Sequence, residues 1–122
     1  VSRAKRLGLK IKETYPLNPD QTDFRSLISK LKTLHVDGLY TPIVFNLVPF
    51  YTQVREQKLK IPIISSDIIA DEHIRQAPEA FEGIYQTNLD NPVSPEYRRL
   101  EALYESRYRR KPAMPWFTAV GF

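Results

Sequence analysis

Few residues of the chain belong to the types that carry out catalysis. The sequence contains no cysteine and two histidines, His35 and His73. Neither histidine has carboxylates or a nucleophile at a spacing typical of a metal site or a catalytic relay. Gly38 and Gly83 are isolated, so a glycine-rich phosphate-binding loop is not expected. These patterns predict a protein that binds its ligand without chemical change, with no catalytic residue, metal or cofactor.

Two aspartates, Asp67 and Asp71, follow a short apolar stretch at 61–64. A carboxylate at such a position can neutralise a cationic ligand, or it can accept hydrogen bonds from the first amides of the next helix. The lysine and acidic cluster that accompany the aspartate of a phosphoryl-accepting receiver domain are not evident. A ligand contact and a helix cap both stay open for Asp67, whereas Asp71 is a candidate for the helix cap alone.

The elements that must position these side chains come from a chain of ordinary globular composition. It has 122 residues, of which 42% are apolar, enough for one domain with a modest core. The formal net charge is +4, but the basic residues are spread out, so a nucleic-acid surface is not predicted. No apolar run reaches the ~18 residues that cross a bilayer, and we expect any export signal to lie upstream.

Hydrophobic periodicity divides the chain into alternating strands and helices. Apolar and charged residues alternate over 9–15, which predicts a half-buried strand. Thr22 is expected to cap a helix with apolar residues up to Leu34, and Asn46 to cap a second one up to Val54. Further strands are predicted at 38–41, 61–64 and 83–88, with a short helix before residue 77 and a longer helix that begins at Ser94.

This alternation predicts an α/β fold with three layers, in which helices flank a mostly parallel sheet on both faces. In such sheets ligands bind beyond the carboxyl ends of the strands. The loops at those ends are 42–46, 65–71 and 88–94. Binding residues are therefore expected there.

Six stretches of the sequence, in their joint order and spacing, resemble the C-terminal lobe of type I periplasmic binding proteins, especially the leucine, isoleucine and valine group. They are IKETYP, DFRSLISKLKTLHVDGLYTP, VPFYTQVREQKLKIPIISSD, FEGIYQTN, LEALYESRYRRKP and TAVGF. The resemblance implies a Rossmann-like lobe in which residues 1–122 form a single partial unit. Because family lobes start with a further strand and continue past TAVGF, we expect this lobe to be incomplete at both ends, or to be completed by a second chain.

The resemblance also implies a function. It is that of a periplasmic or extracytoplasmic substrate-binding protein, which captures branched-chain or related amino acids, or amide-like compounds, and delivers them to an ABC permease. A ligand-sensing domain of a receptor or regulator would have the same fold, and the sequence does not separate these two alternatives. No nucleic-acid partner is expected.

Relatives of the branched-chain group place a carboxylate after the third strand of this lobe, where it pairs with the α-ammonium of the ligand. The matching residue is Asp67. The loop at 42–46 matches a region where relatives place an aromatic or apolar residue over the ligand, which makes Val44 and Phe45 candidates, although Phe45 could equally belong to the core. Asn46 is a further candidate that is also expected to cap a helix. The aromatic pair at 116–117 is better interpreted as packing.

Overall fold

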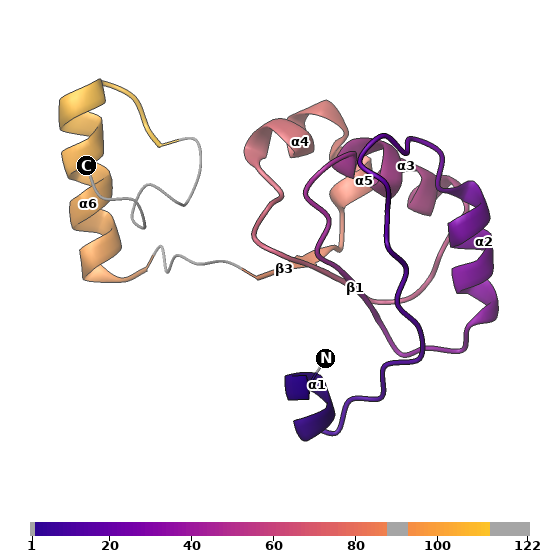
Figure 1. Cartoon of the computed structure of the whole chain (residues 1–122). Coiled ribbons are helices and arrows are strands. Elements are labelled where there is room, and N and C mark those ends of the chain that lie inside the picture. The colour runs from indigo at the N-terminus through magenta and orange to yellow at the C-terminus, as the bar shows by residue number, and fades with distance from the viewer. Residues whose placement is uncertain (1, 88–92, 113–122) are drawn as a thin grey trace.

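The computed structural model describes residues 2–87 and 93–112. Its helices are α1 (Ser2–Arg6), α2 (Arg25–Thr33), α3 (Leu47–Glu56), α4 (Asp71–Gln76), α5 (Pro78–Phe81) and α6 (Pro95–Tyr108), and its strands are β1 (Leu39–Thr41), β2 (Ile63–Ser65) and β3 (Tyr85–Gln86). Figure 1 shows α2 to α5 gathered around the strands, whereas α1 and α6 stand apart from that body. The predicted aromatic pair, Trp116 and Phe117, lies outside the described residues.

The three strands form one parallel sheet in the order β1-β2-β3. Its register pairs Leu39 with Ile63, Tyr40 with Ile64, Thr41 with Ser65, Ile64 with Tyr85, and Ser65 with Gln86. A helical connection separates each strand from the next, as parallel pairing requires. The predicted α/β class, a mostly parallel sheet flanked by helices, is therefore confirmed.

The core lies between α2, α3, α5 and one face of the sheet. Ile28 of α2 and Tyr51 of α3 are completely buried, and Ile63 of β2 is 3% exposed. The core consists of Phe24, Ile28, Leu31, Leu47, Phe50, Tyr51, Val54, Leu59, Ile63, Ala80 and Phe81. Its apolar residues recur three or four positions apart on α2 and α3, which puts them on one side of each helix.

The strand predicted at 9–15 is absent from the sheet, so that prediction was wrong. The segment has no strand pairing, and Leu9 and Ile11 are 61% and 42% exposed. An alternating pattern forms a strand only where a neighbouring strand accepts its backbone hydrogen bonds. Here the segment contacts α2 through exposed side chains, and Lys30 Nζ lies 3.6 Å from Glu13 Oε2.

The starts of two helices differ in how well the sequence predicted them. Thr22 does not cap the first of them: α2 begins at Arg25, whose backbone N–H donates to Asp23 Oδ1 at 3.0 Å. Ser94 caps α6 as expected, because its hydroxyl oxygen accepts from the backbone N–H of Tyr97 at 3.1 Å. A short polar side chain near a helix start is thus a reliable signal for the helix, but not for which residue caps it.

Candidate functional site

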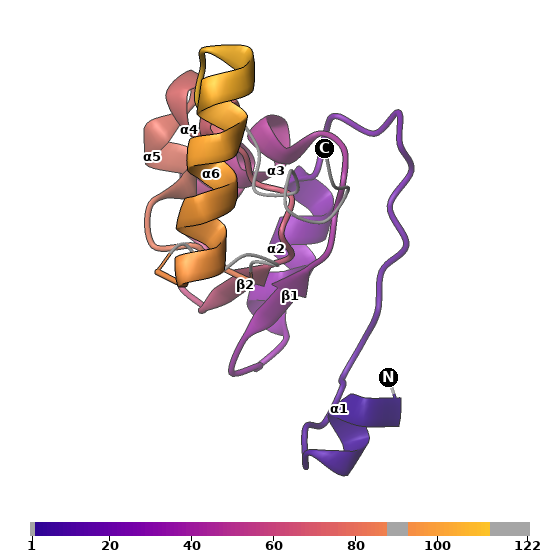
Figure 2. The same ribbon diagram turned by 90° about the vertical axis from the view of Figure 1, so that its left-hand side faces the viewer.

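The carboxyl ends of the three parallel strands meet at one edge of the sheet. These ends are Thr41, Ser65 and Gln86. The loop at 42–46 leaves β1 at this edge, and the loop at 66–70 leaves the neighbouring strand β2 (Figures 1 and 2). The structure therefore brings the loop that carries Val44, Phe45 and Asn46 to the same sheet edge as the loop that carries Asp67, as the sequence predicted for a parallel sheet.

Asp67 lies in a turn two residues beyond the end of β2 and is half-buried. It does not cap α4, because the residue at the cap position is Ala70. The backbone N–H of Ala70 donates instead to Nδ1 of His73, at 3.0 Å. Asp71 is already inside the first turn of α4 and does not occupy the cap position either. The helix-cap alternative for the two aspartates is therefore excluded.

Val44 and Phe45 occupy the connection between β1 and α3. Val44 is 63% exposed, whereas Phe45 is half-buried. Phe45 is not among the buried residues of the core. An exposed valine beside a half-buried ring gives this loop an apolar surface at the sheet edge.

Asn46 is the N-cap residue of α3, as the sequence predicted, but its side chain makes no capping hydrogen bond. Its backbone is left-handed, with φ of 54°, a conformation that asparagine tolerates better than most residues. Its Nδ2 donates to the carbonyl oxygens of Pro19 and Gln21, both at 2.7 Å. A side-chain amide has two N–H donors, and both donors of Asn46 form hydrogen bonds to the preceding loop.

Two further side-chain amides, one in α3 and one just after its end, continue this contact. Gln53 and Gln57 lie seven and eleven residues after Asn46, on the same side of the helix. Gln53 Nε2 donates to the Thr22 carbonyl at 2.7 Å, and its Oε1 accepts from the Phe24 N–H at 2.6 Å. Gln57 Nε2 donates to a backbone carbonyl at the start of α2, at 2.9 Å. Asn46, Gln53 and Gln57, here called the amide ladder, bind α3 to the chain from residue 19 to the first turn of α2.

Buried hydroxyl groups lie at the carboxyl edge, and the sequence analysis did not single them out. Thr41 Oγ1 lies 2.7 Å from the hydroxyl oxygen of Tyr51 and also donates to the Ile64 carbonyl at 3.3 Å. Ser65 is completely buried, and its Oγ has no hydrogen-bond partner within the described part of the chain. The signal that could have revealed them is a hydroxyl residue as the last residue of two successive apolar strands.

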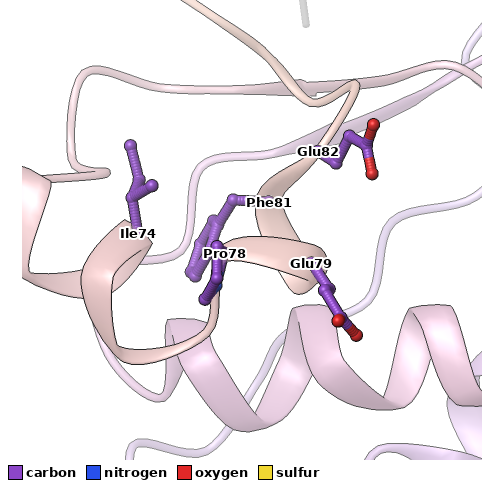
Figure 3. A pocket seen from close by; sticks show the side chains of 5 residues that line it. All are labelled: Ile74, Pro78, Glu79, Phe81 and Glu82. Atoms are coloured by element: carbon purple, nitrogen blue, oxygen red, sulfur yellow. The ribbon is translucent and has the colours of Figure 1, made fainter.

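Two surface hollows lie away from this edge, on the helices. One has a volume of about 370 Å³ and the other about 460 Å³. The first is lined by Ile74, Pro78, Glu79, Phe81 and Glu82 (Figure 3), and the second by Thr52, Arg55, Glu56, Ala77, Pro78, Glu79 and Ala80. Figure 3 shows the carboxylates of Glu79 and Glu82 on the side away from Ile74. Neither hollow includes a predicted binding residue.

A comparison with known protein families identifies the family of this chain. A family of periplasmic binding proteins matches residues 1–122, the whole of the sequence. The chain belongs to the periplasmic binding protein family. A search of curated proteins gave no match. Membership supports a solute-binding role, as proteins of this family bind small molecules outside the cytoplasm and typically work with ABC permeases.

For a periplasmic binding protein, the carboxyl edge is where the fold places a ligand. None of the described helices is both long enough and apolar enough to cross a membrane. Among the described residues, no three histidine or carboxylate side chains gather as metal ligands. The carboxylate of Asp67, in the loop that follows β2 at this edge, is half-buried.

Proposed function

We propose that this periplasmic binding protein is the extracytoplasmic substrate-binding component of an ABC transporter and holds a branched-chain or related amino acid at the carboxyl edge of its sheet. In this proposal Asp67 anchors the α-ammonium group of the ligand. The observation that carries it is the position of Asp67: just past the end of β2, half-buried, and outside the cap of α4.

The chemistry of the anchor follows from the charge of the ligand. An ammonium group removed from water needs an opposite charge and oxygen acceptors, because a neutral surface would leave its lost hydration uncompensated. A half-buried carboxylate supplies both. It also has less water around it than a fully exposed one, which strengthens its attraction for a cation.

The neighbouring loop supplies apolar surface for the side chain of the ligand. Val44 is 63% exposed and Phe45 half-buried, so both offer carbon surface that a ligand can cover. Asn46 has a different part in the proposal. Since both N–H donors of its amide bind the carbonyls of residues 19 and 21, Asn46 positions the loop and does not donate to the ligand.

The shape of the edge agrees with a clamp of two lobes. The enclosed part of such a site forms only when a second lobe closes over the first, so one lobe offers a surface and not a cavity. The carboxylate of the amino acid is then held by the other lobe. An amide-like ligand lacks the ammonium group and would gain little from Asp67.

The first prediction concerns Asp67 in the intact, two-lobed protein. We expect leucine or valine to bind saturably in calorimetry, and Asp67→Asn to weaken that binding by about 30-fold or more. This factor corresponds to the roughly 2 kcal/mol lost when one partner of a desolvated, hydrogen-bonded charge pair is removed. Asp71→Asn is the matched control, because Asp71 lies four residues on, in the first turn of α4, and should leave the affinity unchanged.

Two outcomes would contradict this prediction in different ways. Unaltered leucine affinity in Asp67→Asn would remove the anchor while leaving the amino acid as cargo. No response to any amino acid, together with saturable binding of an amide or an aromatic acid, would leave the solute-binding role intact and overturn the cargo.

A further inference from the structure

The peptide group between Ile69 and Ala70 is held from two sides of the fold. Its carbonyl oxygen accepts from Nε2 of Gln86, on β3, at 3.3 Å, and its N–H donates to Nδ1 of His73, on α4, at 3.0 Å. The carbonyl and the N–H of a trans peptide point in opposite directions, so the two contacts act on opposite edges of one planar unit. This unit ends the loop that carries the candidate anchor, Asp67, three residues before Ala70.

The contact with His73 follows from the residue at the start of α4. Ala70 is the cap residue and is 6% exposed, but alanine has no side chain with which to cap a helix. Its buried N–H needs an acceptor, and His73, the third residue of α4, supplies one. This is one half of a capping box, in which the third helical residue accepts from the backbone N–H of the cap residue.

The imidazole of His73 can accept this hydrogen bond only while it is neutral. A neutral imidazole has one N–H and one acceptor nitrogen, so with Nδ1 as the acceptor the proton lies on Nε2. An imidazolium carries N–H groups on both nitrogens and would turn a donor toward the N–H of Ala70. Histidine ordinarily changes its charge between about pH 5 and 8, whereas the amide of Gln86 does not titrate.

The charged groups around α4 make no bond to this imidazole. Those on the loop before α4, on α4 itself and on or just after α5 are Asp67, Asp71, Glu72, Arg75, Glu79 and Glu82. On α3, Arg55 donates to the Ala80 carbonyl and Glu56 pairs with Arg25. Among the described residues, no ion pair or hydrogen bond joins any of these groups to His73. Protonation therefore acts first on the contact with Ala70.

We propose that His73 is a positioning residue for Asp67: it holds the loop in its binding conformation only while the imidazole is neutral, so the affinity for the ligand falls in acid. The proposal rests on the proposed function, in which Asp67 anchors the ligand. His73 does not touch the ligand in it. When the imidazole takes up a proton, the Ile69–Ala70 peptide keeps the contact with Gln86 and loses the one with α4, which frees the end of the loop.

Leucine binding to the intact, two-lobed protein tests the proposal at about pH 7.5 and about pH 5.5. We expect the unsubstituted protein to bind leucine about fivefold or more weakly at the lower pH, as the loss of one hydrogen bond predicts. His73→Gln should bind equally at both values, because a glutamine at the third helical position can accept the same hydrogen bond and does not titrate. His73→Leu has no acceptor and should bind weakly at both.

The matched control is His35→Gln, the same substitution at the other histidine of the chain, which is exposed. This variant should retain the fall in affinity at the lower pH. The ligand and the second lobe are the same in both glutamine variants, so a difference between their pH profiles belongs to His73. A fall that persists in His73→Gln, or equal affinities at the two pH values in the unsubstituted protein, would overturn the proposal.

Amide hydrogen exchange in the intact protein without ligand tests His73 separately from the cargo. The quantity measured is the protection factor of the Ala70 amide, which is corrected for the effect of pH on exchange itself. We expect it to fall about fivefold or more at the lower pH in the unsubstituted protein and to stay constant in His73→Gln. This pattern without any leucine binding would support the contact and overturn the proposed cargo. A protection factor that stays constant in the unsubstituted protein would overturn the role of His73.

Discussion

At the scale of the residue, the most closely coupled titratable side chains lie on the segment before α2. The Tyr15 hydroxyl donates to Glu13 Oε2, and Lys30 Nζ lies 3.6 Å from that oxygen and 4.8 Å from the centre of the Tyr15 ring. The hydrogen bond from Tyr15 holds the pKa of Glu13 below its ordinary 4.5, with a smaller contribution from the Lys30 charge, while desolvation opposes both. The same hydrogen bond raises the pKa of Tyr15 above 10.0.

The sign of the pH dependence follows from these directions. A carboxyl whose pKa is lowered by folding stabilises the fold above its ordinary pKa, and that contribution is lost as the pH falls through the folded value. The raised pKa of Tyr15 gives a contribution that is present below 10.0 and is lost as the pH rises through its folded value. The contact is therefore favourable near neutral pH and weakens toward both extremes.

We predict that Tyr15→Phe returns the pKa of Glu13 toward 4.5, because the variant removes the largest cause of the shift. A carbon-detected NMR titration of the Glu13 carboxyl measures it. Tyr40→Phe removes a hydroxyl from a distant tyrosine and should leave the titration unchanged. A value at or above 4.5 in the unsubstituted protein would contradict the contact between the two side chains.

At the scale of the element, two short polar residues precede the longer helices and act differently. The Ser94 hydroxyl caps α6, whereas the Asn46 amide donates to carbonyls of the preceding loop. Aspartate is as good a cap as asparagine or serine, so Ser94→Asp should change the free energy of unfolding by less than about 0.5 kcal/mol. Asn46→Asp should lower the free energy of unfolding by about 1–3 kcal/mol. The substitution removes both N–H donors and places a carboxylate next to two carbonyl oxygens.

Urea unfolding of both variants, near neutral pH, measures these two differences. Aspartate adopts the left-handed backbone conformation about as readily as asparagine, so the comparison isolates the hydrogen bonds from backbone strain. An equal effect of the two substitutions would mean that Asn46 acts as an ordinary cap.

The elements that the sequence predicted well are those whose information is local. The spacing of apolar residues along one side was enough to predict the helices α2, α3 and α6. Short apolar runs between turn residues were enough to predict the strands β1 and β2. The prediction of a strand at 9–15 was wrong because the alternation of apolar and charged residues does not show whether a neighbouring strand is available for pairing. The position of Asn46 at the start of α3 was predicted, but the hydrogen bonds of its side chain were not, because their acceptors lie 27 and 25 residues away, beyond any local pattern.

At the scale of the whole molecule, stability should depend on the layer between the helices and the sheet. Ile28 is completely buried there, whereas Ile74 of α4 is 43% exposed beside a surface hollow. Ile28→Ala should lower the free energy of unfolding by about 2–5 kcal/mol, because it removes buried carbon and leaves a cavity. Ile74→Ala makes the same chemical change and should cost well under half as much. Denaturant unfolding measures both, and similar losses would contradict the location of the core.

The candidate site could be predicted to a similar extent, and for a related reason. Parallel strands require their carboxyl ends to meet, which brought the loops of Val44 and Asp67 to one edge. Which of these side chains touch a ligand stays a prediction. The buried hydroxyls of Thr41 and Ser65 were not foreseen, because serine and threonine at a strand end are common and their burial depends on helices elsewhere in the chain.

The amide ladder has one more consequence, which concerns the surroundings in which the protein works. Its three side chains are uncharged at every pH that a folded protein meets, so neither acid nor salt alters their hydrogen bonds. The ion pair that crosses the same contact, Arg25 with Glu56 at 3.4 Å, is exposed and contributes little. The contact between α2 and α3 should therefore hold equally well over a wide range of ionic strength and acidity in the surrounding medium.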